Sequence, residues 1–283
     1  MGEVMRTFWL NYHVAYRCRH SGACCSAGWP IPIEGHRVAS VEQAIAVGIV
    51  TPAASPWLHA DPAVPDDAAG VLAMQVDGHC VWHQPASAPL SAPSRGCAIH
   101  SARPLSCVHF PYVCLIDVRG VHVTLSHYCP TAASLLFDYQ GPADIVEGPS
   151  PIEGLEVPEG LDARDCARAA VPAPYSWPAA PTETESLWNQ LVEPTWNVWA
   201  IVVGRYLTAK VFASWATNLG DGIPAVLRGV EQARSVLQIE AARQCARTGR
   251  PLDAALLKEA IRQSDLLLVH YADSSQLVSS TTA

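Results

Sequence analysis

Residues 18–25 read CRHSGACC and residues 96–111 read GCAIHSARPLSCVHFP, and these two stretches decide what the first half of the chain folds around. Together they hold five of the ten cysteines in the 283-residue sequence. Thiolates are soft ligands, and several of them converging on Zn²⁺ or on an iron–sulfur cluster form a closed, stable site. Adjacent cysteines such as Cys24 and Cys25 do not readily form a disulfide with each other, because the required geometry strains the intervening peptide. Both can bind a metal if Gly22 permits a tight turn.

The predicted metal ligands are all cysteines of the first half of the chain: Cys18, Cys24, Cys25, Cys80, Cys97, Cys107 and Cys129. Arg103 lies between Cys97 and Cys107, where its charge can offset several thiolates without binding the metal itself. Four histidines neighbour cysteines and are further candidates, although a lone histidine is more often a surface group: His20, His83, His100 and His109. Cys114, Cys166 and Cys245 are expected to be small packing residues, since a free cysteine often has that role.

Composition limits the class of protein. Apolar residues make up 49% of the chain and charged residues 16%, so it can bury a core. A formal net charge of −8 argues against a protein that binds nucleic acid or an anionic membrane, because both bind most tightly to clustered Lys and Arg side chains. Residues 1–20 show no secretory pattern, and the apolar stretch 196–219 carries Arg205 and Lys210, so we expect a cytoplasmic protein. Thiols stay reduced there, which favours metal ligands over disulfides.

Three segments are predicted. Residues 1–140 form a cysteine-cluster, metal-binding module. Residues 141–181 hold eight prolines and seven acidic residues, and we interpret them as an acidic connector. Residues 182–283 form a helical C-terminal region. The expected partners are a metal ion or cluster and, for an enzyme, a protein substrate, while the oligomeric state stays open.

The fold class predicted is α+β. The irregular N-terminal module contains short β-hairpins at Asp77-Gly78 and at Arg119-Gly120, each between runs of alternating apolar residues. In the C-terminal region, residues 182–185 match a capping box, and Val226, Val230, Ala233 and Leu237 share one helical face. Thr248-Gly249 predicts a helix stop, and Pro251 predicts the start of a last helix. The Pro- and Ala-rich loops leave little apolar core in the first module, so bound metal is expected to hold it together.

The cysteine pattern resembles the YkgJ-type cysteine-cluster family, which is described as zinc- or iron-chelating. The matching residues are Tyr16, Cys18, Cys24, Cys25, Cys80, Cys97, Ile99, Arg103, Pro104, Cys107, Phe110, Pro111, Cys129 and Pro130. The resemblance covers about residues 16–130 and implies a metal site built from the seven cysteines. In one departure, Ser21 stands where many members have a second cysteine. The centre therefore uses fewer sulfurs, or a histidine or water completes it.

Within that family, the flagellin lysine-N-methylases attach a helical tail to the same cluster. Residues 205–207 and 262–271 are distantly similar to that tail. This resemblance implies an alternative function, protein lysine methylation with S-adenosylmethionine. The chain has no Gly-x-Gly-x-x-Gly, phosphate loop or radical S-adenosylmethionine motif, which argues against a conventional Rossmann-type methyltransferase. Zinc and iron both accept thiolates, so the sequence leaves open a zinc ion, an iron ion or a 4Fe–4S cluster.

Overall fold

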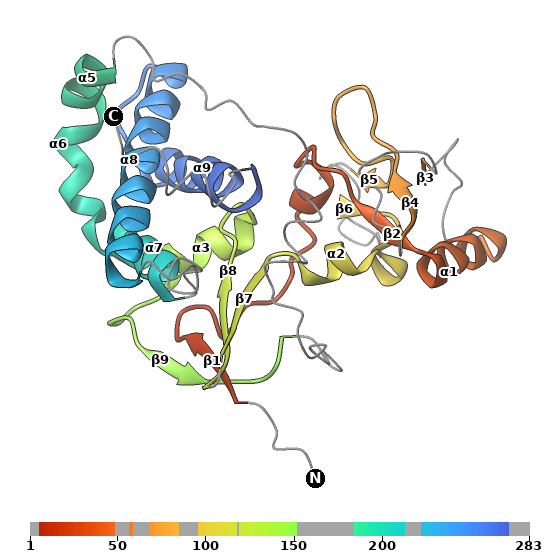
Figure 1. Ribbon diagram of the computed structural model, residues 1–283. Helices are drawn as coiled ribbons and strands as arrows, with labels where there is room; N and C mark the ends of the chain where they lie inside the picture. Colours follow the sequence, from red (N-terminus) through yellow and green to blue (C-terminus); the bar gives the residue numbers. More distant parts are fainter. Residues whose placement is uncertain are drawn as a thin grey trace. The chain divides into compact units, whose positions relative to one another are not determined.

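The computed structural model describes residues 6–48, 57–58, 68–84, 96–117, 119–151, 184–212 and 222–271 (Figure 1). These residues fold into two compact units. The first unit contains the described residues of 1–17, 111–156 and 174–283, and the second contains those of 18–110. Residues of the predicted N-terminal module therefore occur in both units.

A four-stranded sheet organises the first unit. Its strands, in spatial order, are β7 (Tyr112–Asp117), β8 (Gly120–Leu125), β1 (Thr7–Leu10) and β9 (Ile145–Glu147). β7 and β8 form the predicted antiparallel hairpin, but Gly120 already belongs to β8 and pairs with Asp117, so the turn lies one residue earlier than predicted. β1 pairs with β8 in parallel, which requires a crossover, because a tight turn cannot join parallel neighbours. The second unit is the chain between them. β9, from the predicted connector, lies at the sheet edge, where flanking prolines are tolerated.

Helices make up the rest of the first unit. They are α3 (Pro130–Asp138), α5 (Thr184–Leu187), α6 (Glu193–Trp196), α7 (Ala200–Phe212), α8 (Gly222–Thr248) and α9 (Ala254–Asp265), with π-helical turns at Trp188–Val192 and Leu266–Tyr271 and a 3₁₀ turn at Asn197–Trp199. Figure 1 shows α8 and α9 packed side by side. Leu237 of α8, Leu257 and Ile261 of α9 and Tyr206 of α7 are fully buried in their shared core. The predicted helical C-terminal region and the α+β class are confirmed.

The boundary between α8 and α9 differs in part from the prediction. α8 ends at Thr248, and Gly249 follows with a φ of 65°, as its stop signal predicts. α9 begins at Ala254 and not at Pro251. Asp253 sets this start, because its side chain accepts a hydrogen bond of 2.9 Å from the Leu256 N–H and caps the helix. The predicted capping box lies partly outside the described residues.

A chain of polar side chains crosses the core of the first unit. His13 and His127 are fully buried, with their Nε2 atoms 3.1 Å apart. His127 also donates from Nδ1 to Asp265 Oδ2 over 3.1 Å, and Lys210 forms an ion pair with the other oxygen of that carboxylate. Thr124 Oγ1 lies 3.2 Å from His13 Nδ1. Every donor meets one acceptor if Thr124 donates to His13 and His13 donates to His127, so both histidines are neutral.

These buried histidines predict a loss of stability in mild acid. Burial, followed by the charges of His127 and Lys210, lowers the pKa of His13 well below 6.5, and burial also lowers the pKa of His127. The unfolded chain therefore binds more protons below about pH 6.5, and folding stability falls as the pH drops. The free energy of unfolding is expected to fall by up to about 1.4 kcal/mol per pH unit for each histidine that stays neutral in the folded protein. Urea unfolding between pH 7.5 and 5, followed by far-UV circular dichroism, checks this, and a flat profile would contradict it.

The second unit is built from short elements. Its strands form a sheet in the order β2 (Pro32–Glu34), β4 (Ala68–Leu72), β3 (Trp57–Leu58) and a pair of β5 (His83–Gln84) with β6 (Gly96–Cys97). Its helices are α1 (Gly35–Ala46) and α2 (Leu105–His109), with 3₁₀ turns at Ala23–Cys25 and His100–Ala102. Four of its buried core residues are cysteines: Cys25, Cys80, Cys97 and Cys107. Thiols thus occupy places that aliphatic side chains usually fill.

The turn at Asp77-Gly78 is present in the second unit, with Gly78 at a φ of 81°. Strand pairing beside it is shorter than predicted and consists of one antiparallel bridge between Met74 and Cys80. The turn nevertheless directs Cys80 back toward the 3₁₀ turn at Ala23–Cys25, because the Cys80 N–H donates to the Cys25 carbonyl oxygen over 2.7 Å. This local pairing brings Cys80 to the other cysteines.

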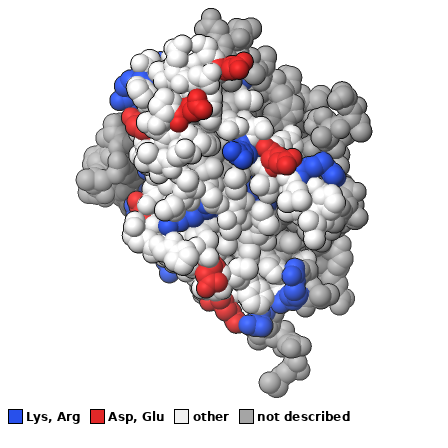
Figure 2. All heavy atoms as spheres, turned by 90° about the vertical axis from the view of Figure 1, so that its left-hand side faces the viewer, with Lys and Arg blue, Asp and Glu red and all other residues white. Residues whose placement is uncertain are grey.

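Charged side chains are sparse and mixed in sign on the face that Figure 2 shows. Among the described residues drawn there, Lys and Arg alternate with Asp and Glu, and most of the surface is uncharged. The described residues drawn in Figure 2 therefore form no extended basic surface. None of the described helices combines the length and apolarity that crossing a membrane requires.

Candidate metal centre

The segment from Cys18 to Cys25 supplies the first set of donor side chains. Gly22 has a φ of 74°, a left-handed backbone that glycine adopts without strain, and the 3₁₀ turn Ala23–Cys25 follows it directly. The turn leaves the sulfur atoms of Cys24 and Cys25 4.0 Å apart. The tight turn expected at Gly22 is therefore present.

The segment from Gly96 to His109 supplies the second set. Arg103 has an extended backbone (φ −61°, ψ 149°), as expected for a residue before proline. Pro104 then leads into α2, which carries Cys107. The Leu105 N–H lies 3.2 Å from both carboxylate oxygens of Glu34 and donates to them, which anchors the start of α2 to the end of β2.

The two segments meet at Gly96. Its φ is 85°, and a Cβ atom built there would lie 2.2 Å from the carbonyl oxygen of His20 and 2.9 Å from the Gly22 nitrogen. No side chain fits at that distance. The absence of a side chain at Gly96 is therefore what allows the backbone around His20 to pack against β6.

Replacing Gly96 with alanine is expected to damage the site more than the same change at Gly78. Both glycines have positive φ, where alanine costs about 1–2 kcal/mol. At Gly78 a Cβ meets nothing within 4 Å, whereas at Gly96 it also collides with backbone. We expect Gly96→Ala to lose both stability and bound metal and Gly78→Ala to lose only stability. Urea unfolding followed by tryptophan fluorescence, with metal analysis, checks this; equal effects at the two positions would contradict it.

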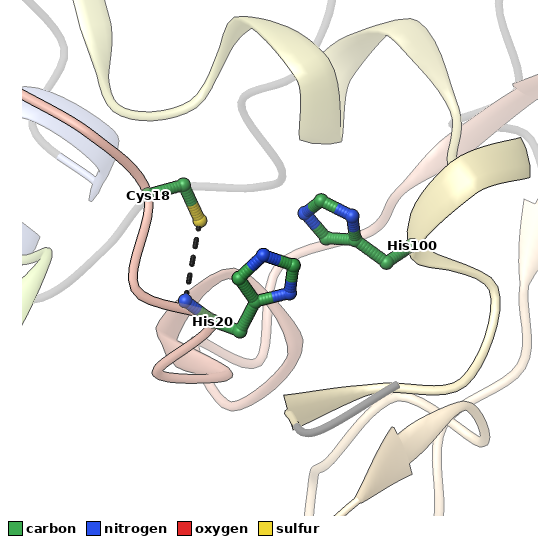
Figure 3. Close-up of side chains that lie close together, drawn as sticks. All are labelled: Cys18, His20 and His100. Carbon is green, nitrogen blue, oxygen red and sulfur yellow. Dashed lines mark hydrogen bonds between the residues drawn. The ribbon is translucent and has the colours of Figure 1, made fainter. Parts of the chain in front are cut away.

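Cys18, His20 and His100 form the closest cluster of potential ligands (Figure 3). We call these three residues the mixed group. The Cys18 sulfur and one ring nitrogen of each histidine all lie within 4.8 Å of one another. The two rings face each other with centroids 3.9 Å apart. Within the described part of the chain, no other set of three His, Cys, Asp or Glu side chains meets as closely.

The backbone of His20 is held in an unusual conformation. Its φ is 53°, and it is the one non-glycine residue with a positive φ among those described. Such conformations are uncommon outside glycine and occur frequently at functional sites. The His20 N–H donates to the Cys18 sulfur over 3.4 Å, so the same bend orients both side chains of this segment (Figure 3).

Arg103 contacts the mixed group through His100. Its Nη1 donates to the His100 carbonyl oxygen over 2.7 Å and lies 2.8 Å from ring Nε2 and 3.1 Å from Nδ1. Burial, then the charges of Arg103 and His20, lowers the pKa of His100 to about 4. The ring is therefore neutral near pH 7 and has a single lone pair, for which Arg103 and a metal ion compete.

Five further thiols gather in the second unit and are called the thiol group: Cys24, Cys25, Cys80, Cys97 and Cys107. Cys25 shares hydrogen bonds with the thiols of Cys24, Cys80 and Cys97. Cys107 lies close enough to Cys24, Cys97 and Cys80 for their negative charges to raise its pKa. The thiol group is thus arranged around Cys25, and its sulfurs do not all lie within 4.8 Å of one another in this part of the described chain.

The thiols of this group differ in acidity. Hydrogen bonding with Cys24, then with Cys80 and Cys97, raises the pKa of Cys25 far above its usual range. The hydrogen bond with Cys25 lowers the pKa of Cys24 and of Cys80. Burial, then the neighbouring thiolates, raises the pKa of Cys107. Cys24 and Cys80 therefore ionise before Cys25 and Cys107, and a metal ion must displace the protons of the latter two.

The donor sets of both groups suit zinc or iron. Thiolate and neutral imidazole are the preferred ligands of Zn²⁺, and both also bind iron. Ligand atoms around one zinc ion lie about 3.3–3.8 Å apart, so the 4.0 Å between the Cys24 and Cys25 sulfurs needs little adjustment. Small rotations of Cys18, His20 and His100 would likewise bring the mixed group to bonding distance.

The structure distributes the seven predicted ligands over different places. Five form the thiol group, and Cys18 belongs to the mixed group. Cys129 lies in the first unit at the start of α3, where its sulfur is 3.5 Å from the Tyr16 hydroxyl. Cys114 is half-buried on β7, and burial raises its pKa to about 11. Cys245 is buried in the helical core, and Cys166 lies outside the described residues.

His20 and His100, the two nitrogen donors of the mixed group, were only further candidates beside the seven predicted cysteine ligands. His20 lies two residues after Cys18 and next to Ser21, where the family resemblance loses a cysteine. His100 lies three residues after Cys97. Their positions close to cysteines in the sequence pointed to both residues, but His83 and His109 also lie close to cysteines. Only the fold shows that His20 and His100 are the two of these four histidines that come together with Cys18.

Comparison with known proteins adds no relatives. No protein-family model matches the chain, and neither a curated protein nor a solved structure matches it.

Proposed function

We propose that this chain is a metal-binding protein that chelates zinc or iron through the cysteine-rich second unit. The observation that carries the proposal is the convergence of Cys18, His20 and His100, whose ligand atoms lie within 4.8 Å of one another. The left-handed backbone of His20 supports it, because a strained residue persists only where its surroundings hold it in place.

The thiol group extends the proposed site. The hydrogen bonds of Cys25 join four of its five sulfurs, and all of its members except Cys80 come from the two segments that also carry the mixed group. The resemblance to the YkgJ-type family points to the same cysteines. Where that family's pattern has a second cysteine, this chain has Ser21, and His20 and His100 supply nitrogen donors beside Cys18.

The donor types favour a borderline or soft metal over Mg²⁺ or Ca²⁺, which prefer oxygen ligands. A zinc ion would be held as a structural centre with the thiol group closed around it. Iron would be held either as an ion or, with inorganic sulfide, as a 4Fe–4S cluster on four thiolates. In either case the chain's own contribution is a set of sulfurs and nitrogens fixed by Gly22, Gly96 and Pro104.

Metal and sulfide analysis of protein purified without oxygen tests the proposal. We expect bound zinc, or bound iron with or without acid-labile sulfide. X-ray absorption at the metal edge is expected to report sulfur ligands with a nitrogen contribution. At saturating metal, the variant Cys18→Ser/His20→Asn/His100→Asn should lose a metal equivalent, whereas Cys114→Ser on β7 should lose none. Protein that binds no zinc or iron after anaerobic reconstitution would overturn the proposal.

A further inference from the structure

We propose that the mixed group is a transit site, which takes a metal ion from solvent and passes it to the buried thiol group, and that Arg103 gives the transfer its direction. This inference rests on the proposed metal-binding function and adds an order of events to it. The ion is zinc or ferrous iron, and the donor is any metal complex in solution that exchanges its ligands.

The two groups differ in exposure. Cys18 is exposed and His20 and His100 are half-buried, so an ion in solution reaches their donor atoms directly. In the thiol group Cys24 is half-buried, while Cys25, Cys80, Cys97 and Cys107 are all buried. An ion bound at the mixed group has therefore left only part of its hydration shell. An ion in the thiol group has lost nearly all of it.

The two groups are also carried largely by the same two segments of the chain. Cys18 and His20 lie on the segment that ends in Cys24 and Cys25, and Cys97 and His100 lie on the other segment. The contact of Gly96 with the His20 backbone brings these two segments together. Arg103 spans them, because it contacts His100 and lies close enough to Cys24 and Cys107 for its charge to act on both thiols. The mixed group thus lies in the same unit as the thiol group, with Arg103 in contact with one and close to the other.

Ligand chemistry sets the direction of transfer. The mixed group offers one sulfur and two nitrogens, so at least one position on a four-coordinate ion stays with water. Four thiolates close the coordination shell and suit zinc and ferrous iron better than imidazole does. The ion is therefore held more weakly at the mixed group than at the thiol group.

Arg103 weakens the mixed group further. Its Nη1 lies 2.8 Å from His100 Nε2 and can donate to that nitrogen in the tautomer whose lone pair is there, so Arg103 competes with a metal for the lone pair. A guanidinium beside a metal cation is also repelled by it. When the ion moves on, Arg103 regains His100 and faces thiolates whose negative charge it can balance. Both effects favour the ion in the thiol group.

The transfer exchanges ligands and moves no electrons. The metal loses its bonds to the Cys18 sulfur and the two imidazole nitrogens and forms bonds to sulfurs of the thiol group. Each thiol that binds gives up one proton. Cys18 takes one proton back as its thiolate is released, and the others pass to water. The oxidation state of the metal is unchanged.

Cobalt(II) tests this order, because its absorption distinguishes thiolate-rich from imidazole-containing coordination. One equivalent is mixed rapidly with the metal-free full chain. We expect a first spectrum with few thiolate ligands, followed by a slower change to a thiolate-rich one. In His20→Asn/His100→Asn the final spectrum should be the same, but its appearance should slow about tenfold, which corresponds to about 1.4 kcal/mol on the barrier.

Arg103→Gln tests the direction. We expect the first species to persist, with the mixed group holding the ion about tenfold more tightly relative to the native protein. Arg19→Gln is the matched control, because it removes the same charge from an exposed residue between Cys18 and His20. It should leave the two phases unchanged.

The outcomes separate the two proposals. If cobalt enters the thiol group in a single phase at the native rate in the double histidine variant, the transit role is overturned while metal binding stands. If the early spectrum never changes and one equivalent remains on the mixed group, the mixed group is a resident site and the transit role is again overturned. If the native chain binds no cobalt, the proposed function itself fails.

Discussion

Chelating the bound metal is expected to make the second unit sensitive to proteases while most of the helical circular dichroism survives. The core of this unit contains Cys25, Cys80, Cys97 and Cys107 beside aliphatic residues, so we expect metal binding to add stability to that of apolar burial. Structural zinc contributes on the order of 10 kcal/mol of apparent binding free energy in small modules, much of it as folding energy. The helices α8 and α9 pack in a separate apolar core and do not depend on those thiols.

Limited proteolysis with mass-spectrometric mapping measures this effect. Cleavage is expected within residues 18–110 of the chelated protein and of Cys24→Ser/Cys25→Ser. Cys114→Ser is the matched control, since it removes a half-buried thiol from β7 and should leave the digestion pattern of the metal-bound protein unchanged. Demetallated protein in which residues 18–110 stay as protected as before would show that these cysteines are core residues without a structural metal.

Asp265→Asn is expected to lower the free energy of unfolding by about 3–5 kcal/mol, the usual cost of breaking a buried ion pair. Asp265 is fully buried, and its carboxylate accepts from both the backbone N–H and the ring Nδ1 of His127. It also pairs with Lys210, which is largely buried. The amide keeps the shape of the side chain but leaves the Lys210 ammonium without its counter-charge.

Urea unfolding followed by far-UV circular dichroism measures the loss. Adding Lys210→Met to Asp265→Asn should restore part of the stability, because the unpaired charge is then removed as well. Glu147→Gln is the control, since its ion pair with Arg6 is exposed at both partners and should not measurably change unfolding. An Asp265→Asn variant as stable as the native protein would contradict the structural role of this network.

Features that depend on neighbours in the sequence were predictable. Arg119-Gly120 between two alternating apolar runs predicts the hairpin of β7 and β8, because a two-residue turn and its flanking strands are specified locally. Gly249 predicts the end of α8 for a similar reason. The spacing of Cys97, Arg103-Pro104 and Cys107 predicts a loop held in one shape, and Arg103 is indeed extended. The sequence predicted that α9 starts at Pro251, but the helix starts at Ala254. The hydrogen bond that the Asp253 side chain accepts from the Leu256 N–H fixes this start, and the preference of Pro251 for a first helical turn does not.

The sequence by itself thus determined the α+β class, the main turns and helices and the soft-donor character of the second unit. Only the tertiary structure decided which donors meet. His20 approaches His100 because Gly96 admits its backbone, and His13 and His127, separated by 114 positions, are neighbours because β1 pairs with β8 across the inserted second unit. Cys129 falls in the first unit for the same reason, since it follows β8. Such contacts depend on how distant segments pack, and local residue preferences carry no information about that packing.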